Sequence, residues 1–503
     1  MSRSRRAGSA LVVGLAAALG DPTAVSAHAL GETFQLPVPL NLYLGGAALA
    51  VAASFVITAL VSRRAPDRPA YPTVAVPTMI ATSARWALRL IGLAWWYGAI
   101  GVGFVVGDIS PLPAVLLWIG IWVGLPIAAV VIGNTWPSLS PFRTTFAAIE
   151  WLAARIGVAR LDVGLRYPAG LARWPAVALL AAGIWAELIL PGSEVAVTVA
   201  TLMVAYTLLT LAGMVLFGQI AWLRHAELFE VELGWFGRIG PLGRRSTTGA
   251  LCSGCAEECD PARCVDCPEC ATAADDAERK AELRPWVVGL TEVTRAGWSD
   301  AAFIVLALAG VSYDGLRETT AGGRLLSFLL PIGESILGLS APMFLIIETV
   351  AFVLVFAAFA AAFTLVVTLT RALNDPGPRP SLGGTTGVYA AALLPIAGGY
   401  LIAHYLTLVI QGVVWLPALI ADPLMSLAPD LSWIPISVVW YLSVGAIVAG
   451  HVAAIVLAHR LALRDAPSRA VVAGLPMVAL MICYTILSLW IIAQPIVVEP
   501  VAS

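Results

Sequence analysis

The sequence is poor in charge. Asp, Glu, Lys and Arg make up only 12% of its 503 residues, and 59% of the residues are hydrophobic. A soluble globular protein carries about 25% charged residues, so this composition excludes an ordinary soluble domain. The formal net charge is −2. That balance supplies no basic surface and argues against a nucleic-acid partner.

Long apolar segments take the place of the missing charge. Runs of about 20 apolar residues recur along the whole chain, and a helix of that length crosses the hydrocarbon core of a bilayer. The sequence therefore predicts an all-α fold, a polytopic bundle of transmembrane helices in a lipid bilayer. The ten predicted spans are residues 38–62, 88–107, 112–133, 174–191, 194–218, 300–316, 342–370, 385–412, 434–459 and 470–494.

The first 29 residues have the pattern of a signal peptide. The basic start MSRSRR is followed by the apolar stretch SALVVGLAAALG and by small residues that end in AVSAHA. This order is typical of a cleaved secretory signal. Cleavage fits after Ala27 or after Ala29, and an uncleaved signal anchor is the alternative.

Arginine is missing from every second loop. The loops DISPLP, PGSE and ADPLMSLAPDLSW contain neither Arg nor Lys, whereas the alternate loops are rich in Arg. Only the loop after the sixth span departs from this pattern, with Arg317 and Arg324. Because basic loops stay in the cytoplasm, the mature N- and C-termini are predicted to face outward. We expect a multi-pass protein of a prokaryotic cytoplasmic (inner) membrane.

The longest basic loop divides the chain. The predicted regions are a signal peptide (1–29), a first five-span half (38–218), a cytoplasmic Cys-rich loop (219–299) and a second five-span half (300–498). Residues 221–236 and 142–158 are predicted to be helices on the membrane surface. Residues 271–286 are predicted to form a charged helix. Residues 326–340 are predicted to lie on the outer leaflet or to re-enter it.

Six of the seven cysteines fall in one short cytoplasmic segment. They are Cys252, Cys255, Cys259, Cys264, Cys267 and Cys270. Thiols stay reduced in the cytoplasm, so disulfides are the less favoured interpretation. Two C-x2-C pairs can present four thiolates to a tetrahedral zinc ion, and an iron–sulfur cluster uses the same ligands. We expect a structural zinc site, with an iron–sulfur cluster as the alternative.

Four ionisable residues are predicted to lie in the outer third of the bilayer. They are Glu187, Asp314, Glu348 and His404. Ionisable groups at lipid depth are costly, so each is a candidate functional residue. Together they could hold a divalent metal or relay protons. The alternative is that each makes its own separate hydrogen bonds at the interface. Tyr400 precedes His404 by one turn on the same helical face.

His451 is a candidate haem ligand in the ninth predicted span. It lies among small residues in the stretch VAGHVAA. His451 is predicted to be some 10 Å or more deeper toward the cytoplasm than His404, which argues against a shared bis-histidine haem. Close helix packing with a buried hydrogen bond is the alternative.

Several segments resemble a known family. SAHALGETFQLPVPLNLYLGGAALAVAASFV, GNTWPSLSPFRTTF, CVDCPEC, GWSDAAFIVLALAGVSYDGLRET and VAGHVAAIVLAHRLAL are similar to a prokaryotic membrane-protein family known as fenitrothion-hydrolase-like. The resemblance implies a polytopic inner-membrane protein and a link to organophosphate ester hydrolysis. The chain departs from the family pattern at Ser140, Phe142 and Arg460.

Three classes of function follow as hypotheses. The first is an enzyme, in which metal-activated water attacks a phosphorus ester at an outward-facing site made by the four outer residues. The second is a transporter or metal-handling protein for a small apolar molecule or a metal ion. The third is an electron-transfer subunit that binds haem and an iron–sulfur cluster within a membrane complex.

Overall fold

The computed structural model describes most of the chain. The described residues are 34–35, 39–62, 71–76, 78–158, 160–245, 266, 280–293, 295–375, 380–425 and 427–498. The signal-peptide region and all six clustered cysteines lie outside these ranges.

Ten helical segments of the described chain are long and apolar enough to cross a membrane. Each overlaps one predicted span, so the all-α polytopic fold is confirmed. The segments are α2 (Leu40–Val61), α3 (Thr78–Val105), α4 (Leu112–Ala114) with η1 (Val115–Gly124) and α5 (Leu125–Val131), α8 (Trp174–Leu188), α9 (Ala196–Phe217), α13 (Trp298–Arg317), α15 (Ala341–Leu373), α16 (Leu382–Ala390) with η6 (Ala391–Leu393) and α17 (Leu394–Ala421), α18 (Ile436–Asp465), and α19 (Ala470–Ile496).

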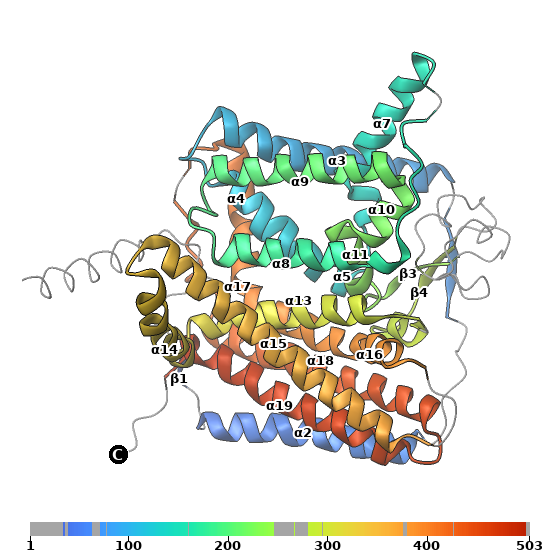
Figure 1. Ribbon diagram of the computed structural model, residues 1–503, viewed down its shortest axis with the longest axis vertical. Coiled ribbons are helices and arrows are strands. Elements are labelled where there is room, and N and C mark those ends of the chain that lie inside the picture. The colour runs from blue at the N-terminus through green and yellow to red at the C-terminus, as the bar shows by residue number, and fades with distance from the viewer. Residues whose placement is uncertain are drawn as a thin grey trace, which may run out of the picture.

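The spans define two ends of the bundle (Figure 1). The sheet end carries α6 (Trp136–Leu139), α7 (Pro141–Arg155) and a three-stranded antiparallel sheet. Its strands are ordered β2 (Thr73–Ala75), β4 (Lys280–Leu283) and β3 (Leu242–Arg245). The opposite end, the termini end, carries α14 (Thr320–Leu337) and a parallel pair of short strands, β1 (Phe34–Gln35) and β5 (Val497–Val498). This pairing places the two ends of the described chain side by side.

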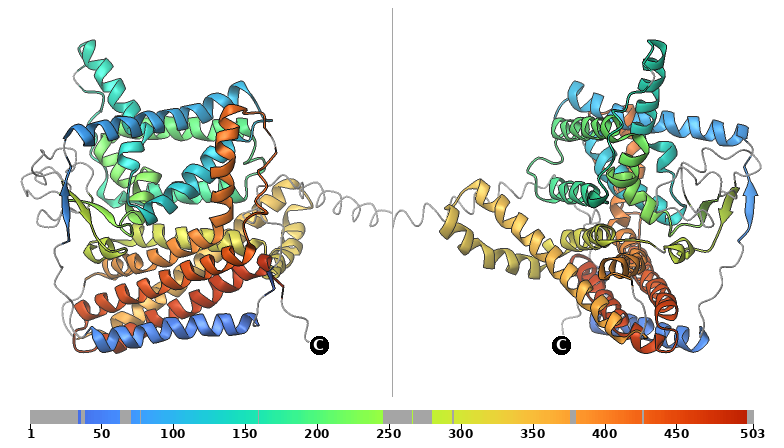
Figure 2. Two further views of the ribbon diagram at one scale, coloured as in Figure 1. Left: turned by 180° about the vertical axis from the view of Figure 1, so that it is seen from behind. Right: turned by 45° about the vertical axis from the view of Figure 1, so that its right-hand side comes forward.

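Packing does not follow the order of the chain. The first span, α2, packs against α18 and α19, near the C-terminus of the chain. Figure 2 shows α2 beneath these helices and far from α3. One packing group therefore contains α3, η1 and α9, and the other contains α2, α8, α13, α15, α17, α18 and α19. The groups meet where α17 contacts η1, and α10 packs on both α9 and α8.

The segment predicted to lie on the membrane surface at 221–236 is instead two helices, α10 (Gln219–His225) and α11 (Leu228–Phe236). All but one residue of α11 is buried. For α11 the surface prediction was wrong because Glu227 and Glu230 find partners inside the protein. Glu230, for example, pairs with Arg143 at 2.9 Å. Polar groups can be buried when they are paired in this way.

Three other local predictions can be compared with the structure. The helix predicted at 142–158 is α7, and the stretch 326–340 lies largely within the single helix α14. The prediction of a charged helix at 271–286 is wrong at 280–283. These residues form β4, which pairs with β2 on one side and β3 on the other. The two flanking strands form hydrogen bonds with the backbone of these residues, and this pairing outweighs their helical propensity.

Candidate functional site

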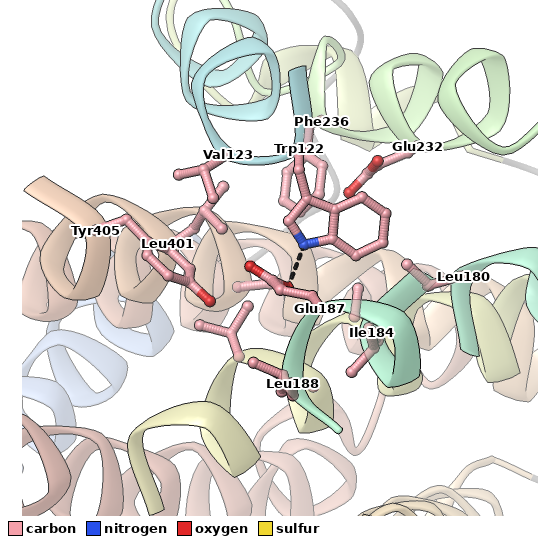
Figure 3. Close-up of a pocket in the computed structure, with 14 residues that line it drawn as sticks. Trp122, Val123, Leu180, Ile184, Glu187, Leu188, Glu232, Phe236, Leu401 and Tyr405 are labelled. Atoms are coloured by element: carbon pink, nitrogen blue, oxygen red, sulfur yellow. Dashed lines mark hydrogen bonds between the residues drawn. The ribbon is translucent and has the colours of Figure 1, made fainter. Parts of the chain in front are cut away.

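A small cavity lies where the two packing groups meet (Figure 3). Its volume is about 30 Å³, enough for water-sized occupants. The walls come from η1, α8, α11, α13 and α17 and are mainly apolar. Four lining residues carry polar groups, namely Trp122, Glu187, Glu232 and Tyr405. An apolar pocket with a few convergent polar groups is the usual form of a binding site.

Trp122 is held in the cavity wall by an unusual helix. It belongs to η1, a ten-residue π-helix, and such segments are frequent at functional sites. The indole Nε1 donates a hydrogen bond of 2.5 Å to Glu187 Oε2. Gly183 makes room for the ring, because a Cβ at that position would come within 2.4 Å of the indole Cη2. The orientation of Trp122 therefore depends on both η1 and α8.

Glu232 is the unpaired acid of the site. Its side chain comes from α11, is 7% exposed and lines the cavity. Its Oε2 has no hydrogen-bond partner among the residues that the structure describes. Burial, reinforced by the charge of Glu227, raises the pKa of Glu232 to about 8. The carboxyl is therefore mostly neutral at pH 7. Figure 3 shows Glu232 above the Trp122 ring and Glu187 below it.

Asp314 and His404 form a buried cluster beside the cavity. His404 Nε2 lies 2.9 Å from Asp314 Oδ2, and the Tyr405 hydroxyl donates to the same oxygen at 2.7 Å. Tyr400 stacks on His404 with ring centroids 5.8 Å apart. Gly315 permits this packing, because a Cβ there would lie 2.8 Å from the Tyr400 hydroxyl. Tyr405 also lines the cavity, so it joins this cluster to Glu187 and Glu232.

Glu348 has a different partner. Its Oε2 accepts a hydrogen bond from Arg317 at 3.2 Å, and both side chains are 30% exposed. Arg317 also donates to the Leu188 carbonyl at 2.5 Å. The guanidinium therefore links the termini-end tips of α8 and α13 to α15.

The four residues predicted from sequence therefore lie near one another but do not all share one contact. Asp314 and His404 meet directly, Glu187 lies within electrostatic range of Asp314, and Glu348 is bound to Arg317. Across the described ranges, no group of three or more His, Cys, Asp and Glu side chains is arranged to hold a metal ion. These four residues therefore do not fit a shared metal centre, since three converging ligands are the minimum for a catalytic zinc.

A second buried acid, Glu227, lies at the start of α11. Its carboxylate accepts hydrogen bonds from the Tyr206 hydroxyl at 2.5 Å and from Trp136 Nε1 at 3.1 Å. It also caps α11 by accepting from the backbone N–H groups of Phe229 at 3.1 Å and Glu230 at 2.6 Å. The side chain is fully buried. Burial raises its pKa to about 7, although the hydrogen bond from Tyr206 opposes the shift.

His451 lies at a close helix crossing. It is fully buried in α18, and its Nδ1 lies 2.8 Å from the Ile447 carbonyl. The neighbouring Gly450 packs directly on α17, where a Cβ would come within 2.3 Å of the Pro395 carbonyl oxygen. These contacts accord with the packing alternative, and haem ligation at His451 stays a prediction.

The cysteines of the predicted metal loop lie outside the described residues, but Asp266, between Cys264 and Cys267, is described. Its backbone N–H donates to the Arg244 carbonyl at 2.8 Å, and its Oδ1 accepts from the Arg244 N–H at 2.8 Å. Its Oδ2 accepts from the fully buried Arg284 at 2.7 Å. Asp266 is therefore fixed to the sheet at the edge formed by β3.

Sequence reasoning missed several residues of the site, including Trp122, Glu232, Tyr405, Glu227 and Trp136. Trp136, for example, is 1% exposed and donates to Glu227. The available signal was the stretch AELFEVELGW, in which Glu227, Glu230 and Glu232 interrupt an apolar run. Three acids so close together in an apolar helix indicate buried partners as well as a surface.

No protein-family model, curated protein or solved structure matches this chain.

Proposed function

We propose that this chain is a proton-coupled membrane transporter, with Glu187 and Glu232 as its central proton-binding residues. The observation that carries the proposal is the pair of acids facing one cavity between two helix groups. Transport sites commonly lie at such a junction, where one group of helices moves against the other.

The properties of the cavity favour a proton over a larger substrate at this position. The cavity volume of about 30 Å³ accommodates water but not an organophosphate ester. Glu232 is buried and has no counter-charge of its own within the described ranges, so burial favours its protonated form. A buried acid whose pKa lies near neutral pH can bind and release protons under physiological conditions.

The cluster next to the cavity supplies a route toward the termini end. Tyr405 connects the cavity to Asp314, which also contacts His404. Beyond it, Arg317 and Glu348 are 30% exposed. Chains of Asp, Glu and His in membrane helices are typical proton relays. In this proposal, Asp314 exchanges the proton between Glu187 and the termini end.

A charge-displacement measurement tests the proposal without knowledge of the transported substrate. The purified protein in liposomes on a solid-supported membrane is exposed to a rapid pH step. We expect a transient current as the central acids bind protons, and we expect Glu187→Gln and Glu232→Gln to lose most of it. Glu194→Gln, an exposed acid in the loop after α8, is the matched control. Equal currents in all three variants would sink the proposal.

The hydrolase hypothesis makes a different prediction. Metal-activated hydrolysis through Glu187, Asp314, Glu348 and His404 requires turnover of an organophosphate ester that Glu348→Ala and His404→Ala both abolish. The contacts of Glu348 with Arg317 and of His404 with Asp314 engage two of the groups that this mechanism needs as metal ligands. Ester turnover lost in both variants, with folding intact, would restore the enzyme interpretation.

We also propose that the sheet end lies in the prokaryotic cytoplasm and that its cysteine loop binds a structural zinc ion. The arginine-rich loops and the spacing of the six cysteines support this assignment, and the fixed position of Asp266 anchors the chain between Cys264 and Cys267. Elemental analysis of the purified protein should find zinc, and Cys264→Ser combined with Cys267→Ser should remove it. Iron in place of zinc would instead indicate the iron–sulfur alternative.

A further inference from the structure

The environment of Glu227 suits two protonation states. The ionised carboxylate accepts four hydrogen bonds and caps the N-terminus of α11, where the helix dipole favours a negative charge. Complete burial opposes that charge. These two effects act against each other, so neither state is strongly preferred near neutral pH.

A buried hydroxyl next to this site lacks a well-formed hydrogen bond while Glu227 is ionised. Tyr206 donates to Glu227 and accepts from the Leu228 N–H at 3.1 Å. Thr210 lies one turn further along α9, close to the Tyr206 hydroxyl. Its side chain is fully buried, and its Oγ1 has no partner of normal hydrogen-bond geometry within the described part of the chain. A buried polar atom without a partner is costly, which suggests that it is used in another state.

We propose that Glu227 is a second proton-binding residue and that Thr210 accepts the Tyr206 hydroxyl when Glu227 is protonated. This inference rests on the proton transport proposed above. The proton binds Glu227 Oε1, and the new O–H donates to Tyr206 Oη. The Tyr206 O–H then rotates from Glu227 to Thr210 Oγ1. No covalent bond other than the new O–H forms or breaks, and the carboxyl changes from −1 to neutral.

The charge of Glu227 acts on the cavity through Glu232 on the same helix. The ionised Glu227 helps to raise the pKa of Glu232, so neutralising Glu227 lowers the affinity of Glu232 for its proton. Protonation also replaces a charged helix cap with a weaker neutral one at the start of α11. A proton that arrives at Glu227 therefore favours release of the proton held in the cavity.

Few other titratable groups face Glu227. Tyr206 approaches from α9, and α6 contributes only the neutral Trp136. Arg143 of α7 is engaged by Glu230, and His225 at the end of α10 stacks on Tyr167. On α11 itself the neighbours are Glu230 and Glu232. The carboxyls that can titrate near this helix are therefore Glu227, Glu232 and, across the cavity from Glu232, Glu187.

Infrared difference spectroscopy during a pH titration of the full-length protein measures these carboxyls directly. In wild type we expect a protonated-carboxyl component with a midpoint of about 7, which Glu227→Gln removes. Thr210→Val keeps the shape of the side chain but removes the acceptor of the neutral state. It should lower that midpoint by about one pH unit, the equivalent of one hydrogen bond. Thr201→Val is the matched control, an exposed hydroxyl on the same helix bonded to Val197.

Two outcomes would overturn the inference. One is a component with a midpoint of about 7 that survives Glu227→Gln in a Glu232→Gln background, and the other is a Thr210→Val midpoint equal to that of wild type. If Glu227→Gln fails to fold, Thr210→Val still decides, because it removes only an unpartnered hydroxyl. A different result would contradict the transport proposal. Absent charge displacement with a normal Glu227 titration contradicts transport alone, and normal charge displacement without a Glu227 component contradicts only this inference.

Discussion

Glu227 caps the N-terminus of α11, Glu232 lies in the middle of the same helix, and both are buried. Glu227 receives four hydrogen bonds, two from side chains on α9 and α6 and two from the backbone N–H groups of Phe229 and Glu230. Glu232 faces a cavity, and its Oε2 has no partner in the described structure. Burial raises both pKa values, to about 7 for Glu227 and about 8 for Glu232. Hydrogen bonds that favour the charged form account for the lower value at Glu227.

A similar contrast holds between the acids of the outer cluster and Glu232 in the cavity. Asp314 has two side-chain partners, and Glu348 has a cationic one. Removing an acid with such partners costs their contacts, whereas Glu232 Oε2 has no partner to lose among the described residues. Substitutions of these acids, and of the indole that binds Glu187, should therefore differ in how much they change the stability. They should also differ in whether that change depends on pH.

The largest effect is expected at Asp314. Asp314→Ala leaves His404 and Tyr405 buried without their shared acceptor, so the free energy of unfolding should fall by about 3–5 kcal/mol. Thermal unfolding in detergent measures this loss. Asp108→Ala, at an exposed acid before α4, should change the stability by less than about 0.5 kcal/mol. Similar losses in the two variants would remove the distinction between paired and exposed acids.

The next effect concerns the pH dependence of stability. Glu232 has a pKa of about 8 when folded and 4.5 as an ordinary carboxyl. Below about pH 4.5 it is protonated in both states. As the pH rises toward 8, the unfolded state ionises first, so stability is lost across this window. Glu232→Gln should remove roughly 2–3 kcal/mol of this loss, less than full linkage because the unfolded chain retains structure.

Unfolding of wild type and Glu232→Gln at several pH values measures this effect. The two curves should coincide at low pH and separate as the pH approaches 8. Parallel curves would mean that Glu232 has an ordinary pKa when folded and that another group stabilises its carboxylate.

A matched tryptophan pair tests the link between η1 and Glu187. Trp122→Phe removes a hydrogen bond to a carboxyl and should cost about 1.5–3 kcal/mol if Glu187 is ionised. Trp118→Phe, one turn earlier, removes a bond to the Ser193 carbonyl and should cost about 0.5–1.5 kcal/mol. Unfolding measurements on both variants compare the two acceptors. Equal losses would indicate that Glu187 is neutral in the folded protein.

The smallest effect is expected at the half-exposed pair of Glu348 and Arg317. Glu348→Gln keeps the shape of the side chain and removes one charge at a position with 30% exposure. Solvent screens such pairs, so the loss of stability should stay below about 1 kcal/mol. A loss as large as that of Asp314→Ala would place Glu348 in the buried cluster after all.

The sequence predicted the membrane fold almost completely because length and hydropathy alone identify a span. It also placed Asp314 and His404 at matched depth from their distances to the helix ends, and the structure brings them together. It failed at α11, where the same amphipathic pattern describes a surface helix and a buried helix with paired acids. It also gave no sign that Arg317 would bind Glu348, because that contact depends on how α13 and α15 are placed.

The amino-acid sequence by itself determined the ten spans and the presence of several costly acids at lipid depth. Both follow from local chemistry, because the free energy of placing a residue in lipid depends on that residue and its near neighbours. Only the tertiary structure decided that α2 packs beside α19, that α11 is buried, and that Glu187 and Glu232 share one cavity. Those features depend on contacts between segments far apart in the chain, and hydropathy does not specify which helices meet.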